Sequence, residues 1–265
     1  MIEKIRKAGI ITKGVLYAMV GILTLMAAIN AGGQIAGKNA VINYLQNQTF
    51  GQILVVILSI GLIFYALWRL SSAFLDTKGE GSDNKAYLKR TGYFISGLIY
   101  GSLGVSTLIS TLGSSSGSSG NKKESIVASV LNLSYGQTIL YVVAAIFLGV
   151  GFYQFYKGFK KKFLEDIDNR GSVESDTVLE NSGRIGFIAR GISFAIFAWF
   201  IYRASSENNA DAVRGIEGMF SYLNQLSYGT IIMALMAIGF IAYGVYQYFL
   251  ARYSNLYSNP ARSYA

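Results

Sequence analysis

Residues 7–17, KAGIITKGVLY, set out a pattern that the chain repeats at 90–100, RTGYFISGLIY, and at 184–194, RIGFIARGISF. Each copy has a basic residue, a glycine two positions later, a second glycine five positions after that, and then an aromatic residue. Each copy also opens a long apolar stretch. A sequence that repeats in this way is built from repeated structural units, so these copies decide the fold.

A second, shorter pattern follows within each unit. It reads TFGQ at 49–52, SYGQ at 134–137 and SYGT at 227–230, and each occurrence opens another apolar stretch. The unit is therefore a pair of apolar helices. Three such helical hairpins in tandem account for most of the chain.

The composition is that of a membrane protein. Apolar residues make up 52% of the chain and charged residues 14%, whereas about a quarter of an ordinary soluble domain is charged. The absence of Cys and His excludes disulfides, thiolate chemistry and most transition-metal sites. The net charge of +9 does not indicate a nucleic-acid partner, because membrane proteins collect Lys and Arg in their cytoplasmic loops.

Six apolar runs approach the ~20 residues that a membrane-spanning helix needs. They centre on residues 14–29, 52–67, 93–112, 138–155, 185–201 and 230–250. Lys13 and Arg190 are then expected near helix ends, from which long side chains reach the headgroups. The predicted fold class is an all-α integral membrane protein with six transmembrane helices, built from three tandem helical hairpins in a pseudo-threefold arrangement.

Lys and Arg crowd on one side of the predicted membrane: the N-terminal segment, the connections around 70–91 and 156–184, and the C-terminal segment. The opposite side has Lys38, Lys122, Lys123, Arg203 and Arg214. Both termini are therefore expected in the cytoplasm. The basic start MIEKIRK also fits a secretory signal, but its glycine spacing recurs in two internal helices, so we interpret it as the start of the first span.

The repeat gives the domain boundaries. Repeat 1 covers residues 1–78 and repeat 2 covers 79–164, each with two transmembrane helices. An acidic cytoplasmic linker covers 165–182, and repeat 3 with the C-terminal tail covers 183–265. A Ser- and Gly-rich run at 113–120 is typical of a flexible insertion.

Small residues recur four positions apart on the first helix of each unit. The pairs are Gly14 with Ala18, Gly97 with Gly101, and Gly191 with Ala195. Small residues at this spacing let two helix backbones approach closely in a membrane. We predict helix packing at Gly14, Gly97, Gly101 and Gly191, with a glycine face opened for a ligand as the alternative.

The non-cytoplasmic connection between the two spans of each hairpin also repeats. Val41, Ile42 and Leu45 in the first copy mark one face of a helix, and the other copies keep apolar residues at these positions. We predict a short interfacial helix in each connection, lying on the outer headgroups. The spacing from Thr49 to Gln52, and the matching spacing in the second copy, fit a capping box that starts the next span.

The repeat places a ring of polar residues near the cytoplasmic ends of the spans. This candidate ring consists of Lys13, Arg69, Gln154, Arg190 and Gln247. Cationic and polar groups at one membrane depth suit a lipid phosphate or an anionic solute. The alternative is that the same residues anchor helix ends in water and headgroups.

The patterns together, basic-x-Gly-x4-Gly-x2-aromatic, aromatic-Gly-polar and small-x-aromatic-polar, resemble the tandem repeat of bacterial membrane proteins catalogued as domain of unknown function 1206. Three two-helix repeats are the usual arrangement in that family, and the resemblance covers about residues 5–253. It implies the fold and a place in the bacterial cytoplasmic membrane, and it implies no activity. The second repeat departs by its insertion and by Ser96 in place of a basic residue.

An enzyme is not expected. None of the acidic residues lies in a predicted span, so no pair of carboxylates is placed in the bilayer for acid–base work or metal binding. The same absence argues against a proton- or sodium-coupled pump. We therefore predict no catalytic residue, no cofactor and no metal site.

Two function classes are left. The favoured one is a non-enzymatic scaffold or accessory subunit, with membrane lipids and another membrane protein as candidate partners, because no repeated polar residue appears in mid-span. The alternative is a passive channel or small-solute permease around the axis. Contact among Gly14, Gly97 and Gly191 on that axis would favour the scaffold, and a polar cavity there would favour the conduit. The oligomeric state is left open.

Overall fold

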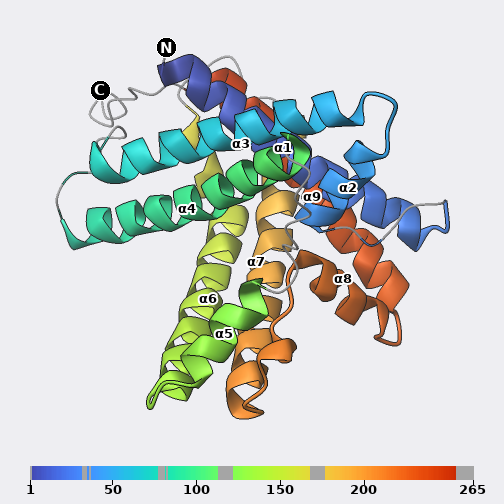
Figure 1. Cartoon of the computed structure of the whole chain (residues 1–265). Helices are drawn as coiled ribbons and strands as arrows, with labels where there is room; N and C mark the ends of the chain where they lie inside the picture. Colours follow the sequence, from blue (N-terminus) through green and yellow to red (C-terminus); the bar gives the residue numbers. More distant parts are fainter. Residues whose placement is uncertain are drawn as a thin grey trace.

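Six long apolar helices, each long enough to cross a membrane, form the body of the protein. The computed structural model describes residues 2–31, 35, 37–76, 81, 83–112, 122–167 and 177–254. The long helices are α1 (Ile2–Ala28), α3 (Gly51–Phe74), α4 (Asn84–Leu112), α6 (Gly136–Phe159), α7 (Thr177–Ser206) and α9 (Gly229–Tyr253) (Figure 1). The predicted all-α fold with six membrane-spanning helices is confirmed.

Shorter helices lie in the connections. They are α2 (Lys38–Gln46), α5 (Lys122–Leu131), η1 (Lys162–Asp166), η3 (Ala210–Ala212) and α8 (Ile216–Asn224). Helix α7 begins within the predicted linker 165–182. The Ser- and Gly-rich run at 113–120 lies outside the described residues.

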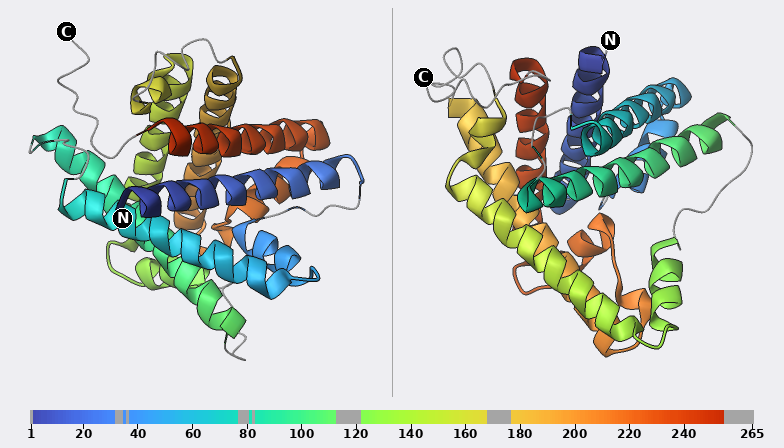
Figure 2. Two further views of the ribbon diagram at one scale, coloured as in Figure 1. Left: turned by 90° about the horizontal axis from the view of Figure 1, so that it is seen from above. Right: turned by 90° about the vertical axis from the view of Figure 1, so that its left-hand side faces the viewer.

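The main helix contacts join neighbouring repeats. Helix α4 packs along α3, α7 packs along α6, and α1 packs along α9, so the first span of each unit meets the second span of the unit before it (Figures 1 and 2). Within a unit, α1 contacts α3 and α7 contacts α9, but α4 and α6 share no extensive contact. The two spans of the second unit are therefore not packed together as those of the other two units are, and the pseudo-threefold arrangement stays a prediction.

The glycines of the repeat lie in these contacts between units, which we call the seams. The seams use equivalent positions of the repeat: Gly14 against Gly244, Gly97 against Ala66, and Gly191 against Gly151. A Cβ added to the first member of each pair would lie 3.0, 3.3 or 3.1 Å from the carbonyl oxygen of the second. Gly101 also faces Ala66. The three first-helix glycines therefore face a neighbouring unit and do not meet on an axis.

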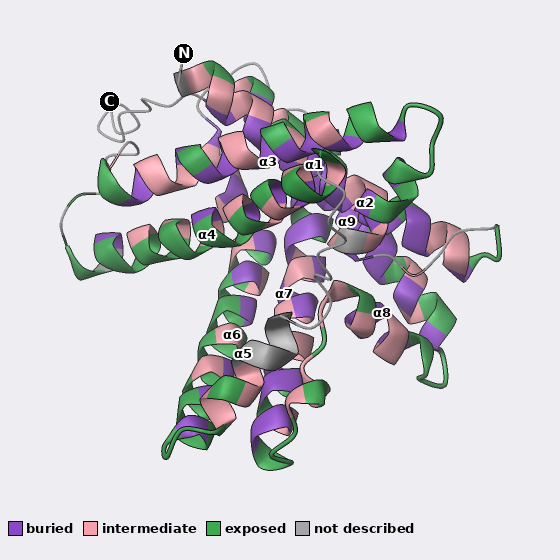
Figure 3. Cartoon of the chain, in the orientation of Figure 1, coloured by how far each residue is buried: buried purple, intermediate pink, exposed green. Residues whose placement is uncertain are grey.

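A second glycine contact closes only two of the hairpins. A Cβ on Gly9 would lie 2.5 Å from the Cα of Tyr65, and one on Gly186 would lie 2.7 Å from the Cα of Tyr243. The equivalent Gly92 has no such neighbour within 4 Å. In the second unit α4 and α6 are also less covered than the other spans, with 22% of the apolar stretch buried against 44–50% elsewhere (Figure 3).

The apolar faces of α2 and α8 turn toward the spans. Val41 and Met219 are completely buried, and Phe220 packs edge-on against Phe240 of α9. The connections are helical as predicted, and the apolar faces of these two helices join the core.

The repeated aromatic-Gly motif makes a tight junction between each connection and the next span. A Cβ on Gly51, Gly136 or Gly229 would come within about 2.3 Å of a carbonyl oxygen at the end of the preceding short helix. The predicted capping box is wrong, because these spans begin at the glycine and have no side-chain cap. The glycine is needed for the close backbone approach.

Candidate functional site

Lys13 lies in the middle of α1 and not at a helix end. The predicted span is centred on residues 14–29 with Lys13 near a helix end, whereas α1 begins at Ile2 and continues to Ala28. The Lys13 side chain is 5% exposed, so it does not reach the headgroups as expected. Hydropathy missed the first turns because it recognises lipid-facing residues, and a polar residue that faces other helices stays inside a span. Arg190 is likewise in the interior of α7.

Two tyrosine hydroxyls join the three basic residues of the predicted ring. Lys13 Nζ donates to the hydroxyl of Tyr65 at 3.1 Å and to that of Tyr243 at 3.2 Å. Arg69 Nε donates to Tyr65 at 2.9 Å, and Arg190 Nη1 donates to Tyr243 at 2.6 Å. Each hydroxyl thus accepts from two cations. We call these five residues, Lys13, Tyr65, Arg69, Arg190 and Tyr243, the cation centre.

Aromatic rings surround the same cations. Lys13 Nζ lies 5.0 Å from the ring centroid of Tyr65, and the Arg190 guanidinium lies 4.5 Å from that of Tyr243. The Arg69 guanidinium lies 4.4 Å from Trp68. Contacts of this kind stabilise a desolvated cation by about 2 kcal/mol each, which is less than the cost of burying a charge.

The cation centre has no acidic counterpart among the described residues. The ion pairs of the described chain lie at helix ends and connections, such as Lys157 with Asp166 and Arg203 with Glu207. Lys13, Arg69 and Arg190 have tyrosine hydroxyls as their side-chain hydrogen-bond partners. The Arg69 Nη1 atom is buried and makes no hydrogen bond. The centre is therefore rich in donors and positive charge.

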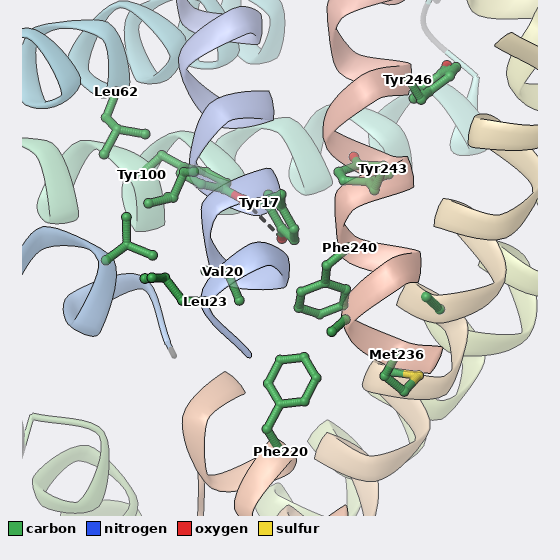
Figure 4. Close-up of a cluster of buried hydrophobic side chains, with 14 of the residues drawn as sticks. Tyr17, Val20, Leu23, Leu62, Tyr100, Phe220, Met236, Phe240, Tyr243 and Tyr246 are labelled. Carbon is green, nitrogen blue, oxygen red and sulfur yellow. Dashed lines mark hydrogen bonds between the residues drawn. The ribbon is translucent and has the colours of Figure 1, made fainter. Parts of the chain in front are cut away.

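A hydrogen-bonded tyrosine pair borders the cation centre. Tyr100 of α4 donates to Tyr17 of α1 at 3.2 Å, and Figure 4 shows the two side chains pointing toward each other. The Tyr17 ring also packs edge-on against Tyr243, with centroids 5.0 Å apart. Lys13 Nζ lies 6.0 and 5.6 Å from the ring centroids of Tyr17 and Tyr100. The tyrosine pair therefore forms one wall of the centre.

The two glutamines of the predicted ring are not part of the cation centre. Gln247 is buried in the seam between α1 and α9, where its Cβ would lie 2.9 Å from a Cβ added to Gly14. Gln154 is buried on α6. Among the described residues, neither side chain hydrogen-bonds to Lys13, Arg69 or Arg190. The structure thus brings together the three basic members of the ring and leaves the glutamines in helix packing.

The sequence pattern does not mark these tyrosines as site residues. Tyr17 and Tyr100 are the aromatic residues that end the first repeated pattern, and Tyr65 and Tyr243 stand at the same position of the second span. Val150 occupies that position in the second unit. The signal was present in the repeat, but aromatic residues are common in spans and did not stand out from packing residues.

Comparisons with known proteins agree with the repeat. A family model described as Domain of Unknown Function (DUF1206) matches three times, at residues 8–76, 91–161 and 185–254. The chain is 29% identical over 246 residues to the uncharacterized protein YxxB of Bacillus subtilis (strain 168), covering 92% of this chain and 88% of the relative. No solved structure matches.

Proposed function

Since this chain belongs to the DUF1206 family, whose description names no function, we propose from the site itself that it is a non-enzymatic multi-pass membrane protein that binds an anion at the cation centre. One observation carries the proposal. Three cationic side chains converge on two tyrosine hydroxyls inside the helix bundle, with no carboxylate beside them among the described residues. A buried charge without a counter-charge is costly in a bilayer, and a bound anion lowers that cost.

The ligand chemistry follows from the donors. Lys13 supplies an ammonium group, and the guanidinium groups of Arg69 and Arg190 suit planar or tetrahedral oxyanions. A halide also meets these donors. The ligand is therefore a small inorganic anion or a phosphate group, and a phosphate can belong to a lipid headgroup or to a dissolved ion.

The position of the centre favours a conduit for anions over a scaffold. The scaffold was favoured because no repeated polar residue was placed in mid-span, but Lys13 lies in the interior of α1 and its partners Tyr65 and Tyr243 lie in the interiors of α3 and α9. One observation still favours an interaction role as well. The exposed surfaces of α4 and α6 are available to another membrane protein.

Location and orientation form part of the same proposal. The protein lies in the bacterial cytoplasmic membrane with both termini in the cytoplasm, because Lys and Arg crowd on that side of the spans. Single cysteines at the exposed Asn132 and Lys160 test this in a cysteine-free chain. An impermeant maleimide applied to intact cells should label the cysteine at 132 and spare the one at 160, and the reverse result overturns the orientation.

Trp68 offers a direct probe of anion binding, because its ring touches Arg69 and is 3% exposed. The chain has two tryptophans, so Trp199→Phe leaves Trp68 as the single reporter. Iodide quenches indole fluorescence on contact, and acrylamide is a neutral quencher. We expect iodide to quench Trp68 well beyond acrylamide in the purified protein, and Lys13→Gln with Arg190→Gln to remove the difference.

Competition distinguishes the two sources of phosphate. Inorganic phosphate should displace iodide if the ligand is a dissolved anion, and phosphatidylglycerol in the bilayer should displace it if the ligand is a lipid phosphate. Arg252→Gln, which removes an exposed cation far along α9, is the matched control and should leave the quenching unchanged. Equal quenching by iodide and acrylamide in the parent protein would overturn the anion-binding proposal.

A further inference from the structure

A fourth cation contacts the tyrosine pair that borders the cation centre. Lys38 is the first residue of α2, in the connection between α1 and α3. Its Nζ atom lies 4.2 Å from the ring centroid of Tyr100 and 5.6 Å from that of Tyr17. Lys38 and Lys13 thus contact the rings of the same hydrogen-bonded tyrosine pair.

The order of contacts along this line is regular. Lys38 contacts Tyr17 and Tyr100, and the same two rings contact Lys13. Lys13 then donates to Tyr65 and Tyr243, to which Arg69 and Arg190 also donate. Cations and tyrosines therefore alternate from the connection that holds α2 to the middle of the spans.

The charge of the surroundings differs between Lys38 and Lys13, the two ends of this series of contacts. Glu217 of α8 lies against Gly37, where a Cβ would be 3.6 Å from a carboxylate oxygen of Glu217, so the surroundings of Lys38 include an acidic side chain. Lys13 has no such neighbour in the described part of the chain. A gradient from a partly balanced cation to an unbalanced cluster draws an anion inward.

We infer that Lys38 is the outer access residue of the cation centre, and that the Tyr17–Tyr100 pair is the barrier which a small inorganic anion crosses between Lys38 and Lys13. This inference rests on the proposed anion binding. It adds a route and a side of approach, and it assigns a role to Lys38, whose equivalent position in the third unit is Ile216. Rotation of either tyrosine opens the hydrogen bond without unfolding a helix.

The test places a controllable charge at position 38. Lys38→Cys in the Trp199→Phe background gives a single thiol, because the chain has no other cysteine. A cationic methanethiosulfonate reagent restores the positive charge at that thiol, and an anionic one reverses it. Both reagents are membrane-impermeant and are added outside proteoliposomes, with iodide quenching of Trp68 as the measurement and acrylamide quenching as the reference.

We expect Lys38→Cys to lower the rate of iodide quenching on the order of 10-fold, as steering charges commonly do. The cationic reagent should restore most of the rate, and the anionic reagent should lower it further. Arg214→Cys, at an exposed cation of the same side, is the matched control, and its rate of iodide quenching should change with neither reagent.

Two outcomes separate this inference from the proposal beneath it. Iodide quenching no stronger than acrylamide quenching in the Trp199→Phe parent overturns anion binding altogether. The route through Lys38 is overturned, with anion binding intact, if iodide quenching is strong but the same after either reagent at position 38. It is also overturned if the reagents do not reach the thiol at 38 from outside. A matching elution profile for each variant confirms that the fold is retained.

Discussion

The first and third repeats differ from the second in the same two places, and both places belong to the cation centre. The outer repeats have a cation before the first-span glycine, Lys13 and Arg190, and a tyrosine in the second span, Tyr65 and Tyr243. The second repeat has Ser96 and Val150 there. The outer hairpins are closed and the second is open. The site therefore lies where two copies of the repeat have the same pair of residues, a cation on the first span and a tyrosine on the second.

The comparison also separates two kinds of glycine. The seam glycines face another unit in all three repeats, whereas the hairpin glycines face a tyrosine only in the first and third. The seams hold the units together, and the hairpin contacts position the tyrosines of the cation centre. Substitutions at equivalent positions of different repeats test this division.

The largest effect is expected at the seams. Leucine at Gly97 or Gly191 forces the backbones of two spans apart, so each variant should lose about 3 kcal/mol or more of stability. Gly149 of α6, which has no such neighbour within 4 Å, is the matched control. Thermal unfolding in mild detergent, followed by circular dichroism, measures the difference. Equal tolerance at the two seams and at Gly149 would contradict the role of the seams.

A smaller effect should separate the closed hairpins from the open one. Gly186→Ala places a methyl group 2.7 Å from the Cα of Tyr243, so we expect a loss of about 1–3 kcal/mol. Gly92→Ala meets open space, and it should be neutral or gain up to about 1 kcal/mol from helix propensity. The same unfolding measurement applies. Destabilisation of both variants to the same degree would show that the second hairpin closes as the others do.

Removing one hydroxyl tests the cation centre itself. Tyr243→Phe takes away the acceptor that Lys13 and Arg190 share, and the loss of an acceptor for buried donors costs about 1–3 kcal/mol. Tyr153→Phe, at an exposed tyrosine of the second repeat, should change stability by less than about 0.5 kcal/mol. A Tyr243→Phe variant as stable as the Tyr153 control would mean that the hydroxyl does not hold the cations.

The smallest effect is expected from giving the second repeat its missing tyrosine. Val150 is 36% exposed, so Val150→Tyr should change stability by no more than about 0.5 kcal/mol. Spin labels on α4 and α6 should report an unchanged distance. A shorter distance with a clear gain in stability would show that the tyrosine alone closes a hairpin.

The sequence predicted the fold well because lipid imposes simple demands. Apolar runs near ~20 residues and repeated glycines, such as Gly14 and Gly191, indicated six spans in three units, and the structure contains the six helices. The ends of the spans were wrong where polar residues face other helices. A hydropathy pattern places the end of a span at a lysine such as Lys13. In the structure this lysine is buried among tyrosines in the interior of α1.

The cation centre could be predicted only in part. Its basic residues stand out because cations are rare in spans, and the repeat predicts a ring that either binds a lipid phosphate or an anionic solute or anchors helix ends. The tyrosine partners come from α3 and α9, which are far apart in the sequence, and which helices pack together is set by the seams. The contact of Lys38 with Tyr100 depends on how α2 folds back onto the spans, and no periodicity in the sequence encodes that.

The central claim is that the three cations inside the spans hold an anion. Crystals of the protein prepared in bromide test it most directly, because the anomalous signal of bromine marks each bound bromide. Frozen particles prepared in bromide are the alternative sample. We expect a bromide peak within hydrogen-bonding reach of Lys13 Nζ and of the Arg69 or Arg190 guanidinium, and no such peak in the Lys13→Gln, Arg190→Gln variant. Bromide peaks at exposed cations such as Arg252 with none at the cation centre would contradict it.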